Sequence, residues 1–475
     1  MQRPKHRPLP DAMNEPINSE RTVSSVVQAS STPEWRKLAY SFGSLGSALL
    51  AQAFSVYILF FYVDTLKGPA IAIGNVMFAY GIWNAINDPL FGLLSDRTRT
   101  RWGRRRPYIA LGTLPLALAF CFLWRPPFGA AQPVPLVTYF ALAVFVWDGL
   151  YTLVILNWTA LFPEMFQSLP ERSRVSGYRQ MFSIIGLILG IALAPLIYET
   201  WGWPVMGLLF AVIGGGAIFV SLLGSRERMD RGRAETQPIG LIDSLKFTLV
   251  NRSFAFYVAG NFLINLAFTI VQAVLPFYTK YVLHLDKFQT SLLFLAVFGV
   301  AFVFMPIWAR FTASRGARQA ILTASLLFGV ILWGFALSRG FLDALATGAL
   351  AGAGLAGLMM LPDVLIADVI DEDQLRAGQR REGAYFGIQA FVIRLGISIE
   401  SVLVTRILEA AGYDPEAAIQ PDTALVALRL LMSGLPFVLL VLVAVAFWFY
   451  PLHGERLAAV RQALPGARVP AVRRG

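Results

Sequence analysis

The sequence is poor in the residues from which catalytic and metal sites are usually built. It has one cysteine, Cys121, and three histidines, His6, His284 and His453, which lie far apart in the chain. A single cysteine excludes an intrachain disulfide or a redox pair, and the scattered histidines make no metal-binding pair. The loops contain no pattern typical of a nucleophile with its base, a metal cluster or a phosphate-binding glycine loop. We therefore expect no cofactor and no enzyme.

Charged residues are also scarce. They make up 15% of the chain and hydrophobic residues 56%, against roughly 25% and 45–50% in a soluble domain. A soluble fold could not bury so much apolar surface. Each crossing needs about 20 apolar residues and, with its loop, roughly 30–40 residues, so 475 residues suffice for twelve crossings. The predicted fold class is an all-α membrane protein with twelve transmembrane helices.

Apolar runs between charged, proline and glycine positions give the predicted spans. They are 38–63, 71–94, 107–125, 135–163, 178–198, 204–224, 254–282, 289–311, 317–338, 342–369, 383–411 and 423–450.

Lysine and arginine are distributed unevenly between the predicted loops. With both termini on one side, that side holds 32 of them, and the opposite loops hold five: Lys67, Arg125, Lys280, Lys287 and Arg339. By the positive-inside rule the first side is cytoplasmic. This topology accounts for the net charge of +11, so no nucleic-acid partner is expected. We expect a multi-pass protein of the inner (plasma) membrane, with the lipid bilayer around it and both termini in the cytoplasm.

The chain divides at its longest polar stretch within the apolar region, Ser225 to Arg252. The two parts echo each other, because the motif Leu161–Glu164 recurs as Leu361–Asp363. Such a parallel repeat is the architecture of the major facilitator superfamily, with two six-helix bundles. The expected division is a disordered cytoplasmic tail (1–35, starting at Met1 or Met13), an N-terminal six-helix bundle (36–224), a cytoplasmic linker (225–253), a C-terminal six-helix bundle (254–450) and a cytoplasmic tail (451–475).

The most informative stretch runs from Trp83 to Pro107. Asn84, Asp88 and Gly92 are four residues apart and so share a helical face, on which Gly92 permits close helix approach. Asp88 lies roughly 10 Å inside the end of its span. An ionisable group at that depth usually faces a cavity and serves transport. The stretch predicts a cation or proton site; the alternative is a structural carboxylate bonded to a neighbouring helix.

The end of the same stretch predicts a gate. Asp96 and Arg97, followed by Gly103, Arg104 and Arg105, resemble the cytoplasmic loop motif of the major facilitator superfamily. Together with Gly92, these residues are expected to cap a helix end and to form charge pairs that close the cytoplasmic side, rather than to contact substrate.

The longer spacing between Asp96 and Gly103 resembles the glycoside-pentoside-hexuronide:cation symporter family, whose best-known member is melibiose permease. Further motifs carry this resemblance over roughly residues 36 to 450: Tyr40–Gly43 with Phe61–Asp64, Asn157–Glu164 with Tyr178–Gln180, and Arg380–Gly387 leading to Arg394. The resemblance implies a major facilitator fold and cation-coupled sugar uptake.

The sequence departs from this family where the family carries its acids. The matching positions hold Asn84 and Asp88, Ala48 and Ile155, so only Asp88 keeps its charge. A sodium site needs several hard oxygens and negative charge, whereas one buried carboxylate suits one proton. Proton coupling is therefore favoured, and sodium stays open because Asn84 can supply an oxygen.

Polar and aromatic residues on five spans are candidates for contact with a hydroxyl-rich substrate, which needs hydrogen-bonding groups and an aromatic platform. For each of them the alternative is an interhelical hydrogen bond or packing. They are Ser44, Ser47, Gln52, Tyr151, Asn157, Trp158, Arg179, Asn261, Asn265, Gln272 and Gln389.

Two further charges lie deep in predicted spans. Arg394 is roughly 17 Å deep, where it either pairs with Asp88 or binds an anionic substrate group, and pairing is favoured because an unpaired buried charge is costly. Asp148 lies roughly 22 Å from the cytoplasmic end of its span. It is either a second protonation site or a carboxylate solvated near the outer mouth.

The leading functional hypothesis is a monomeric secondary transporter for a small molecule, a sugar or glycoside, coupled to H⁺ or Na⁺ and working by alternating access. A transporter of lysophospholipid or another anionic amphiphile is the alternative, because the sugar-gripping acids are missing. A non-transporting membrane sensor is a remote third hypothesis.

Overall fold

The computed structural model describes residues 32–98, 100–166, 168–226, 251–377, 382–417 and 419–463, and throughout these ranges the regular structure is helical. The helices before the predicted linker, called the N-terminal group below, are α2 (Glu34–Phe60) with its π-helical end η1 (Phe61–Thr65), α3 (Ala70–Arg97), α4 (Arg106–Leu123), α5 (Pro133–Met165), α6 (Leu169–Ala192), α7 (Ala194–Trp201) and α8 (Trp203–Gly224).

The helices after the linker, called the C-terminal group, follow the same pattern. They are α10 (Arg252–Phe277) with its π-helical end η2 (Tyr278–Val282), α11 (Lys287–Arg315), α12 (Ala317–Leu337), α13 (Phe341–Ala377), α14 (Glu382–Ala410), α15 (Asp422–Met432), α16 (Gly434–Trp448) and α17 (Gly454–Ala463).

Local sequence signals set several of the helix starts. Proline stands in the first turn of α4, α5, α6, α7 and α8, where its missing N–H costs no hydrogen bond. Asn251 caps α10 by accepting from the Ser253 N–H at 3.0 Å. Asp286 and Gln289 form a capping box at the start of α11.

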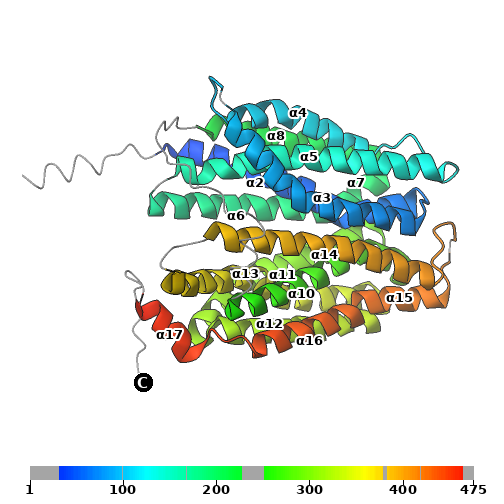
Figure 1. Cartoon of the computed structure of the whole chain (residues 1–475). Coiled ribbons are helices and arrows are strands. Elements are labelled where there is room, and N and C mark those ends of the chain that lie inside the picture. Colours follow the sequence, from blue (N-terminus) through cyan, green and yellow to red (C-terminus); the bar gives the residue numbers. More distant parts are fainter. Residues whose placement is uncertain are drawn as a thin grey trace, which may run out of the picture.

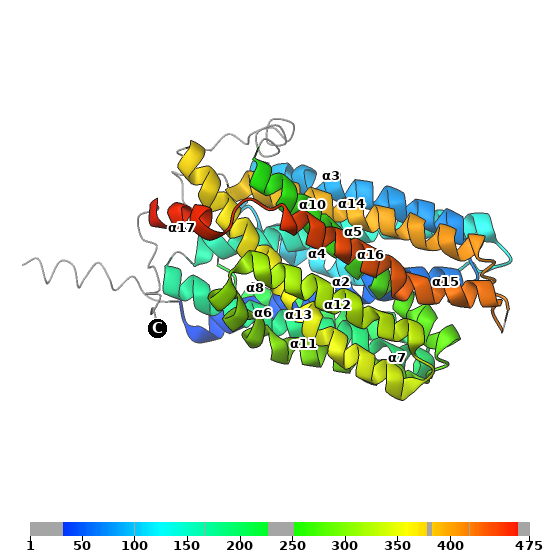
Figure 2. The same ribbon diagram turned by 90° about the horizontal axis from the view of Figure 1, so that it is seen from below.

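The long helices run along one common direction, with the N-terminal group on one side of the molecule and the C-terminal group on the other (Figure 1). Helix α3 lies against α14 along much of its length, as the blue and orange ribbons of Figure 2 show. Helix α2 contacts α10, and α11 contacts α6 and α7. The two groups therefore meet along α2, α3 and α6 on one side and α10, α11 and α14 on the other.

Ten helical segments of the described chain are long and apolar enough to cross a membrane. The two long helices outside these ten are α3, of 28 residues, and α14, of 29 residues. Helix α3 carries Asn84 and Asp88, and helix α14 carries Arg394 and Glu400. Each of these two polar helices contacts the other, so their polar side chains can be satisfied within the protein. The protein is an all-helical integral membrane protein.

The helix bounds differ from the expected spans mainly at the ends that were predicted to be cytoplasmic. Helix α6 begins at Leu169, ahead of the predicted 178, and α13 continues beyond 369 to Ala377, because polar residues outside the hydrocarbon can extend a helix. The expected N-terminal tail falls almost entirely outside the described residues, and α2 already begins at Glu34. Within the expected C-terminal tail, α17 is helical.

Ion pairs attach α17 to α13. Arg456 pairs with Glu372 at 2.5 Å and Arg461 pairs with Asp368 at 2.9 Å. These ion pairs therefore hold α17, the helix that follows α16, against α13.

Glycines allow the closest helix contacts within the N-terminal group. A Cβ atom added to Gly186 of α6 would lie 2.3 Å from the Leu45 carbonyl oxygen of α2, a backbone atom that cannot move aside. Gly216 of α8 has no heavy atom within 4 Å of the same position. Helix α6 can approach α2 this closely because residue 186 lacks a side chain.

We expect Gly186→Ala to destabilise the protein by about 1–3 kcal/mol, because the added methyl group forces two helices apart. The measurement is thermal unfolding of the purified protein in detergent. Gly216→Ala is the matched control and should leave the melting temperature unchanged. Equal melting temperatures for the two variants would contradict this packing.

Candidate substrate and cation site

An ion pair joins the two groups of helices at Asp88 and Arg394. Arg394 of α14 donates from Nη2 to Oδ2 of Asp88 on α3, and from Nη1 to the Asn84 backbone carbonyl at 2.7 Å. The two side chains are 27% and 22% exposed, so this charge pair borders space that water can reach. Arg394 thus binds two positions of the same α3 stretch.

A second carboxylate, Asp148 of α5, accepts hydrogen bonds from side-chain amides of α3. Asn84 donates from Nδ2 to Oδ1 of Asp148 at 2.5 Å, and Asn87 donates to Oδ2. Asp148 is only 1% exposed. The side chain is therefore buried between α3 and α5 rather than solvated near an outer mouth.

Asn84 connects the two carboxylates. Its side chain binds Asp148 and its backbone carbonyl binds Arg394, so Asp148, Asn84, Arg394 and Asp88 form one continuous chain of hydrogen bonds. Arg394 balances the charge of Asp88, whereas the hydrogen-bond partners of Asp148 are neutral: the amides of Asn84 and Asn87 and the hydroxyl of Tyr80. A cation or proton arriving here finds two carboxylates of different character.

Asn87 belongs to this site and the sequence interpretation missed it. It is fully buried, and its own Oδ1 has no hydrogen-bond partner among the described residues. Its spacing of three residues from Asn84 places it on the same helical face. That spacing was the available signal.

The aromatic candidate Trp158 is packed among helices of the N-terminal group. Trp158 stacks on Tyr40 with ring centroids 5.1 Å apart, and the Tyr40 hydroxyl donates to the Trp158 carbonyl at 2.9 Å. The Arg179 guanidinium lies 4.7 Å from the Trp158 ring centroid and 4.9 Å from that of Phe162. The Trp158 side chain is therefore enclosed by residues of α2, α5 and α6.

Three polar candidates on α2 and α5 donate to nearby backbone carbonyls, although the buried Asn157 Oδ1 has no hydrogen-bond partner among the described residues. Tyr151 donates to the Ser47 carbonyl at 3.2 Å, and Ser47 donates to the Ser44 carbonyl at 3.1 Å. Asn157 is buried and donates to the Leu153 carbonyl at 2.8 Å. These bonds link neighbouring turns and helices.

Gln52 and Gln272 meet across the two groups. Gln272 of α10 donates from Nε2 to Oε1 of Gln52 on α2 at 3.2 Å, and Ser55 donates to Gln272 at 3.4 Å. This contact is a second polar link between the groups.

The C-terminal group holds a cavity of about 280 Å³ with a partly polar wall, called the polar cavity below. Three of the substrate candidates, Asn261, Asn265 and Gln389, line it, and Asp363 joins them. Asn261 Nδ2 and Gln389 Oε1 have no hydrogen-bond partner among the described residues. The wall thus offers free polar atoms, and Asp363 was missed although the repeated Leu-Pro-Asp motif contains it.

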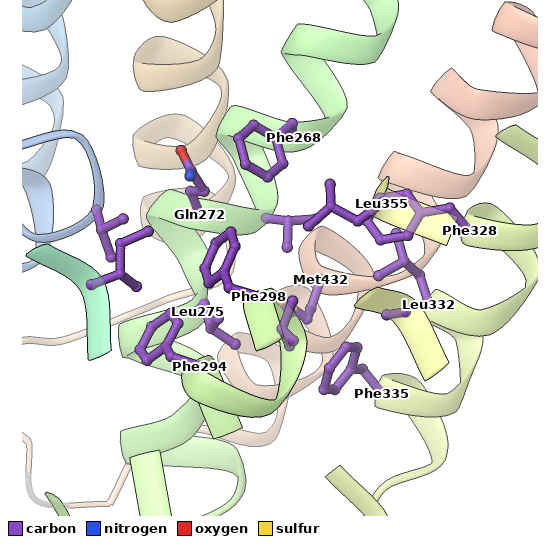
Figure 3. A pocket seen from close by; sticks show the side chains of 15 residues that line it. Phe268, Gln272, Leu275, Phe294, Phe298, Phe328, Leu332, Phe335, Leu355 and Met432 are labelled. Atoms are coloured by element: carbon purple, nitrogen blue, oxygen red, sulfur yellow. The ribbon is translucent and has the colours of Figure 1, made fainter. Parts of the chain in front are cut away.

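A second, much smaller cavity of about 40 Å³, the apolar cavity, shares Phe268, Phe328 and Leu355 with the polar one. Figure 3 shows Phe268, Phe294, Phe298 and Phe335 around it, with Gln272 as the labelled polar side chain. A molecule with a polar and an apolar end matches this pair of cavities in chemistry.

An ion-pair network links the groups at the end of the molecule opposite α17. The buried Asp64 of η1 pairs with Lys280 of η2 at 2.6 Å and accepts from the hydroxyls of Tyr281 and Tyr413. The sequence interpretation missed this outer network, although Asp64 and Lys280 both lie at predicted span ends.

The gate candidates lie at the other end. Glu164 of α5 pairs with Arg104 at 2.6 Å and with Arg105 at 3.2 Å. Gly103 has φ 102°, a conformation that favours glycine. Gly92 is partly buried on α3 and Arg97, in the last turn, is exposed, while the Asp96 side chain lies outside what the structure describes.

Within the described ranges, no group of three or more His, Cys, Asp or Glu side chains could hold a metal ion.

We expect Arg394→Gln to lower the unfolding free energy by about 1–3 kcal/mol, because it leaves Asp88 without its counter-charge in a partly buried site. The double variant Asp88→Asn/Arg394→Gln should lose less than the two single variants combined. Thermal and denaturant unfolding in detergent measure these values. Arg406→Gln, at an exposed position of α14, is the control, and strictly additive losses would contradict a direct interaction.

Comparison with known proteins agrees with this architecture. Residues 39–454 match the family model described as "MFS/sugar transport protein". The isoprimeverose transporter of Lactiplantibacillus pentosus is 28% identical, over 90% of each chain. The sodium-dependent lysophosphatidylcholine symporter 1-B of Danio rerio is 23% identical, over 90% of this chain and 89% of the relative.

The crystal structure of the nucleoside transporter NupG has a TM-score of 0.65 at 13% sequence identity, covering 88% of this chain and all of that one (100%). The likeness concerns the fold. The chain therefore belongs to the MFS/sugar transport protein family, as a membrane transporter of the glycoside-pentoside-hexuronide:cation symporter type and not an enzyme.

Proposed function

We propose that this protein is a cation-coupled symporter of a sugar or glycoside that works by alternating access. The observation that carries the proposal is the charge pair between Asp88 and Arg394, which joins α3 to α14. A cation bound at Asp88 would compete with Arg394 and so change how the two groups of helices hold each other. Binding and conformation would then depend on one another.

The proposed architecture is twelve spans in two six-helix bundles, 36–224 and 254–450, joined by a cytoplasmic linker at 225–253. Helices α3 and α14 supply the two crossings beyond the ten apolar ones. Residues 1–35 and 451–475 would be cytoplasmic, in a monomer of the inner (plasma) membrane. The uneven distribution of lysine and arginine supports this orientation.

Proton coupling is favoured over sodium coupling. Asp88 is already neutralised by Arg394, and Asp148 has amide partners, so the site offers no dense set of anionic oxygens for sodium. Asp148 and Asp88, with Asn84 between them, are the proposed coupling residues. The outer network around Asp64 and the Glu164 pairs with Arg104 and Arg105 are the proposed gates of the two sides.

The substrate is proposed to bind in the C-terminal group against the polar cavity. Asn261, Asn265 and Gln389 provide donors and acceptors for hydroxyl groups, and Phe268 provides an aromatic wall. Gln52 and Gln272 can contribute at the boundary between the groups. Trp158 and Arg179 are proposed to pack within the N-terminal group rather than to contact the substrate.

We expect Asp88→Asn and Asp148→Asn each to abolish uptake against a gradient while exchange of substrate across the membrane continues, because an amide cannot carry the coupling charge. The measurement is uptake by proteoliposomes under a pH gradient or a sodium gradient. Asp343→Asn, at an exposed acid in the first turn of α13, is the control. Gradient-driven accumulation by both site variants at the wild-type level would refute the coupling assignment.

A second candidate substrate is a lysophospholipid or another anionic amphiphile. The apolar cavity beside the polar one favours it, and one relative is named a lysophosphatidylcholine symporter. In this case the phenylalanines would hold the acyl chain and Arg394 the anionic group.

A panel of isoprimeverose, a uronide and lysophosphatidylcholine separates the two candidates. A sugar transporter should take up isoprimeverose or the uronide and should tolerate Phe298→Ala. A lysolipid transporter should take up lysophosphatidylcholine, and Phe298→Ala should raise its KM several-fold, because an apolar wall of the cavity is removed. Uptake of none of the three would contradict both candidates.

A further inference from the structure

Glu400 is a buried carboxylate of α14 that the coupling site does not include. It lies roughly 27 Å along the helix from Glu382, well inside the membrane, and it is 5% exposed. Its Oε2 accepts from the neighbouring Ser401 hydroxyl at 3.4 Å, and its Oε1 has no hydrogen-bond partner in the described chain. A structural carboxylate would be expected to use both oxygens.

The arginines of α14 cannot neutralise Glu400 from where they lie. Arg394 and Arg406 are each six residues away, which places them about 120° around the helix from Glu400. Arg394 is bound to Asp88 and to the Asn84 carbonyl, and Arg406 is exposed. Neither gives Glu400 an ion pair.

The charged residues of the helices packed on α14 are also placed elsewhere. Helix α10 has only Arg252, at its first residue, and α3 has Asp88 and the two charges at its cytoplasmic end. On α15, Arg429 donates to the Ala336 and Ser338 carbonyls, and Asp422 is in the first turn.

Helix α13 carries Asp343 in its first turn, Asp363 in the wall of the polar cavity, and its remaining charged residues from Asp368 onward. A carboxyl group in such surroundings is most stable in its neutral, proton-carrying form.

One face of α14 leads from Glu400 to the polar cavity. Gln389 and Ile393 line that cavity, and Gly396 and Glu400 continue the same face at helical spacing. Gly396 has no side chain and is buried, and an added Cβ would be in ordinary van der Waals contact with Phe262 of α10, at 3.7 Å. On this face, the residue between the cavity wall and Glu400 is therefore a glycine, which has no side chain.

We propose that Glu400 is a proton-binding site of the C-terminal group, loaded from the polar cavity past Gly396. The carboxylate takes up one proton from the polar cavity to become the neutral acid. It becomes a carboxylate again when the proton returns to that cavity. Proton binding at Glu400 does not depend on the identity of the substrate; only its part in coupled uptake rests on the proposed function.

Infrared spectroscopy of the purified full-length protein tests the binding step, with the proton itself as the ligand. The wild type should show a carbonyl band of a buried, protonated carboxylic acid that decreases as the pH is raised and shifts in D₂O. The Glu400 component of this band, read from the wild-type minus Glu400→Gln difference spectrum, should be absent in Glu400→Gln and shifted but present in Glu400→Asp, while Asp148, the other buried carboxyl proposed to bind a proton, contributes equally to both spectra. Glu409→Gln, at an exposed acid of the same helix, is the matched control and should keep the band.

A wild-type spectrum without this band, or an unchanged band in Glu400→Gln, would overturn the proposal. The route is tested by Gly396→Leu, which fills the step beside Phe262 and should slow the D₂O shift of the band at least several-fold. An unslowed shift would overturn loading from the polar cavity. Because no substrate is used, these results are independent of whether sugar uptake is found.

Discussion

The contact between Asp88 and Arg394 is an ion pair that joins the two groups of helices through α3 and α14. Each charge alone would be costly at this depth, and together they make a pair that borders accessible space. The pair also accounts for two helices that are too polar to rank among the apolar spans, since α3 and α14 meet along the line that contains it. The stretch from Asn84 to Asp88 then extends the link to Asp148 on α5.

Other polar contacts between the groups are arranged around this link. The outer network joins Asp64 to Lys280, Tyr281 and Tyr413, and Gln52 contacts Gln272 at the boundary of α2 and α10. The cavities are lined largely by the C-terminal group. The proposed substrate and coupling groups therefore lie mainly in neighbouring helices, and α14 contributes Gln389 to the first and Arg394 to the second. A change at the pair can reach the substrate wall along one rigid helix.

Much of this architecture could be predicted from the sequence. Each predicted span falls on one or two of the observed helices, because long apolar runs between charged loops leave few alternatives. Asp88 and Arg394 could be singled out because charges are so rare within the spans. Asn87 was equally readable from its spacing and was overlooked, as was Glu400.

The rest depended on tertiary contacts that no local pattern contains. Asp148 is held by Asn84 and Asn87 from another helix, and the stacking of Tyr40 on Trp158 decides that this tryptophan is enclosed. Asp363 is marked by a repeated motif, yet only packing shows that it lines a cavity with Asn261. Side chains of one type thus differ in role according to which neighbouring helix they meet.

The central claim is that a cation acting at Asp88 changes the relation between the two groups. It is tested most directly by the distance between spin labels at Ser176 of α6 and Ser314 of α11, introduced as cysteines after Cys121→Ser and measured by pulsed electron paramagnetic resonance. Acidification or added sodium should shift the distance distribution of the otherwise wild-type protein and leave that of Asp88→Asn unchanged. Identical distributions for the wild-type site under all conditions would contradict the claim.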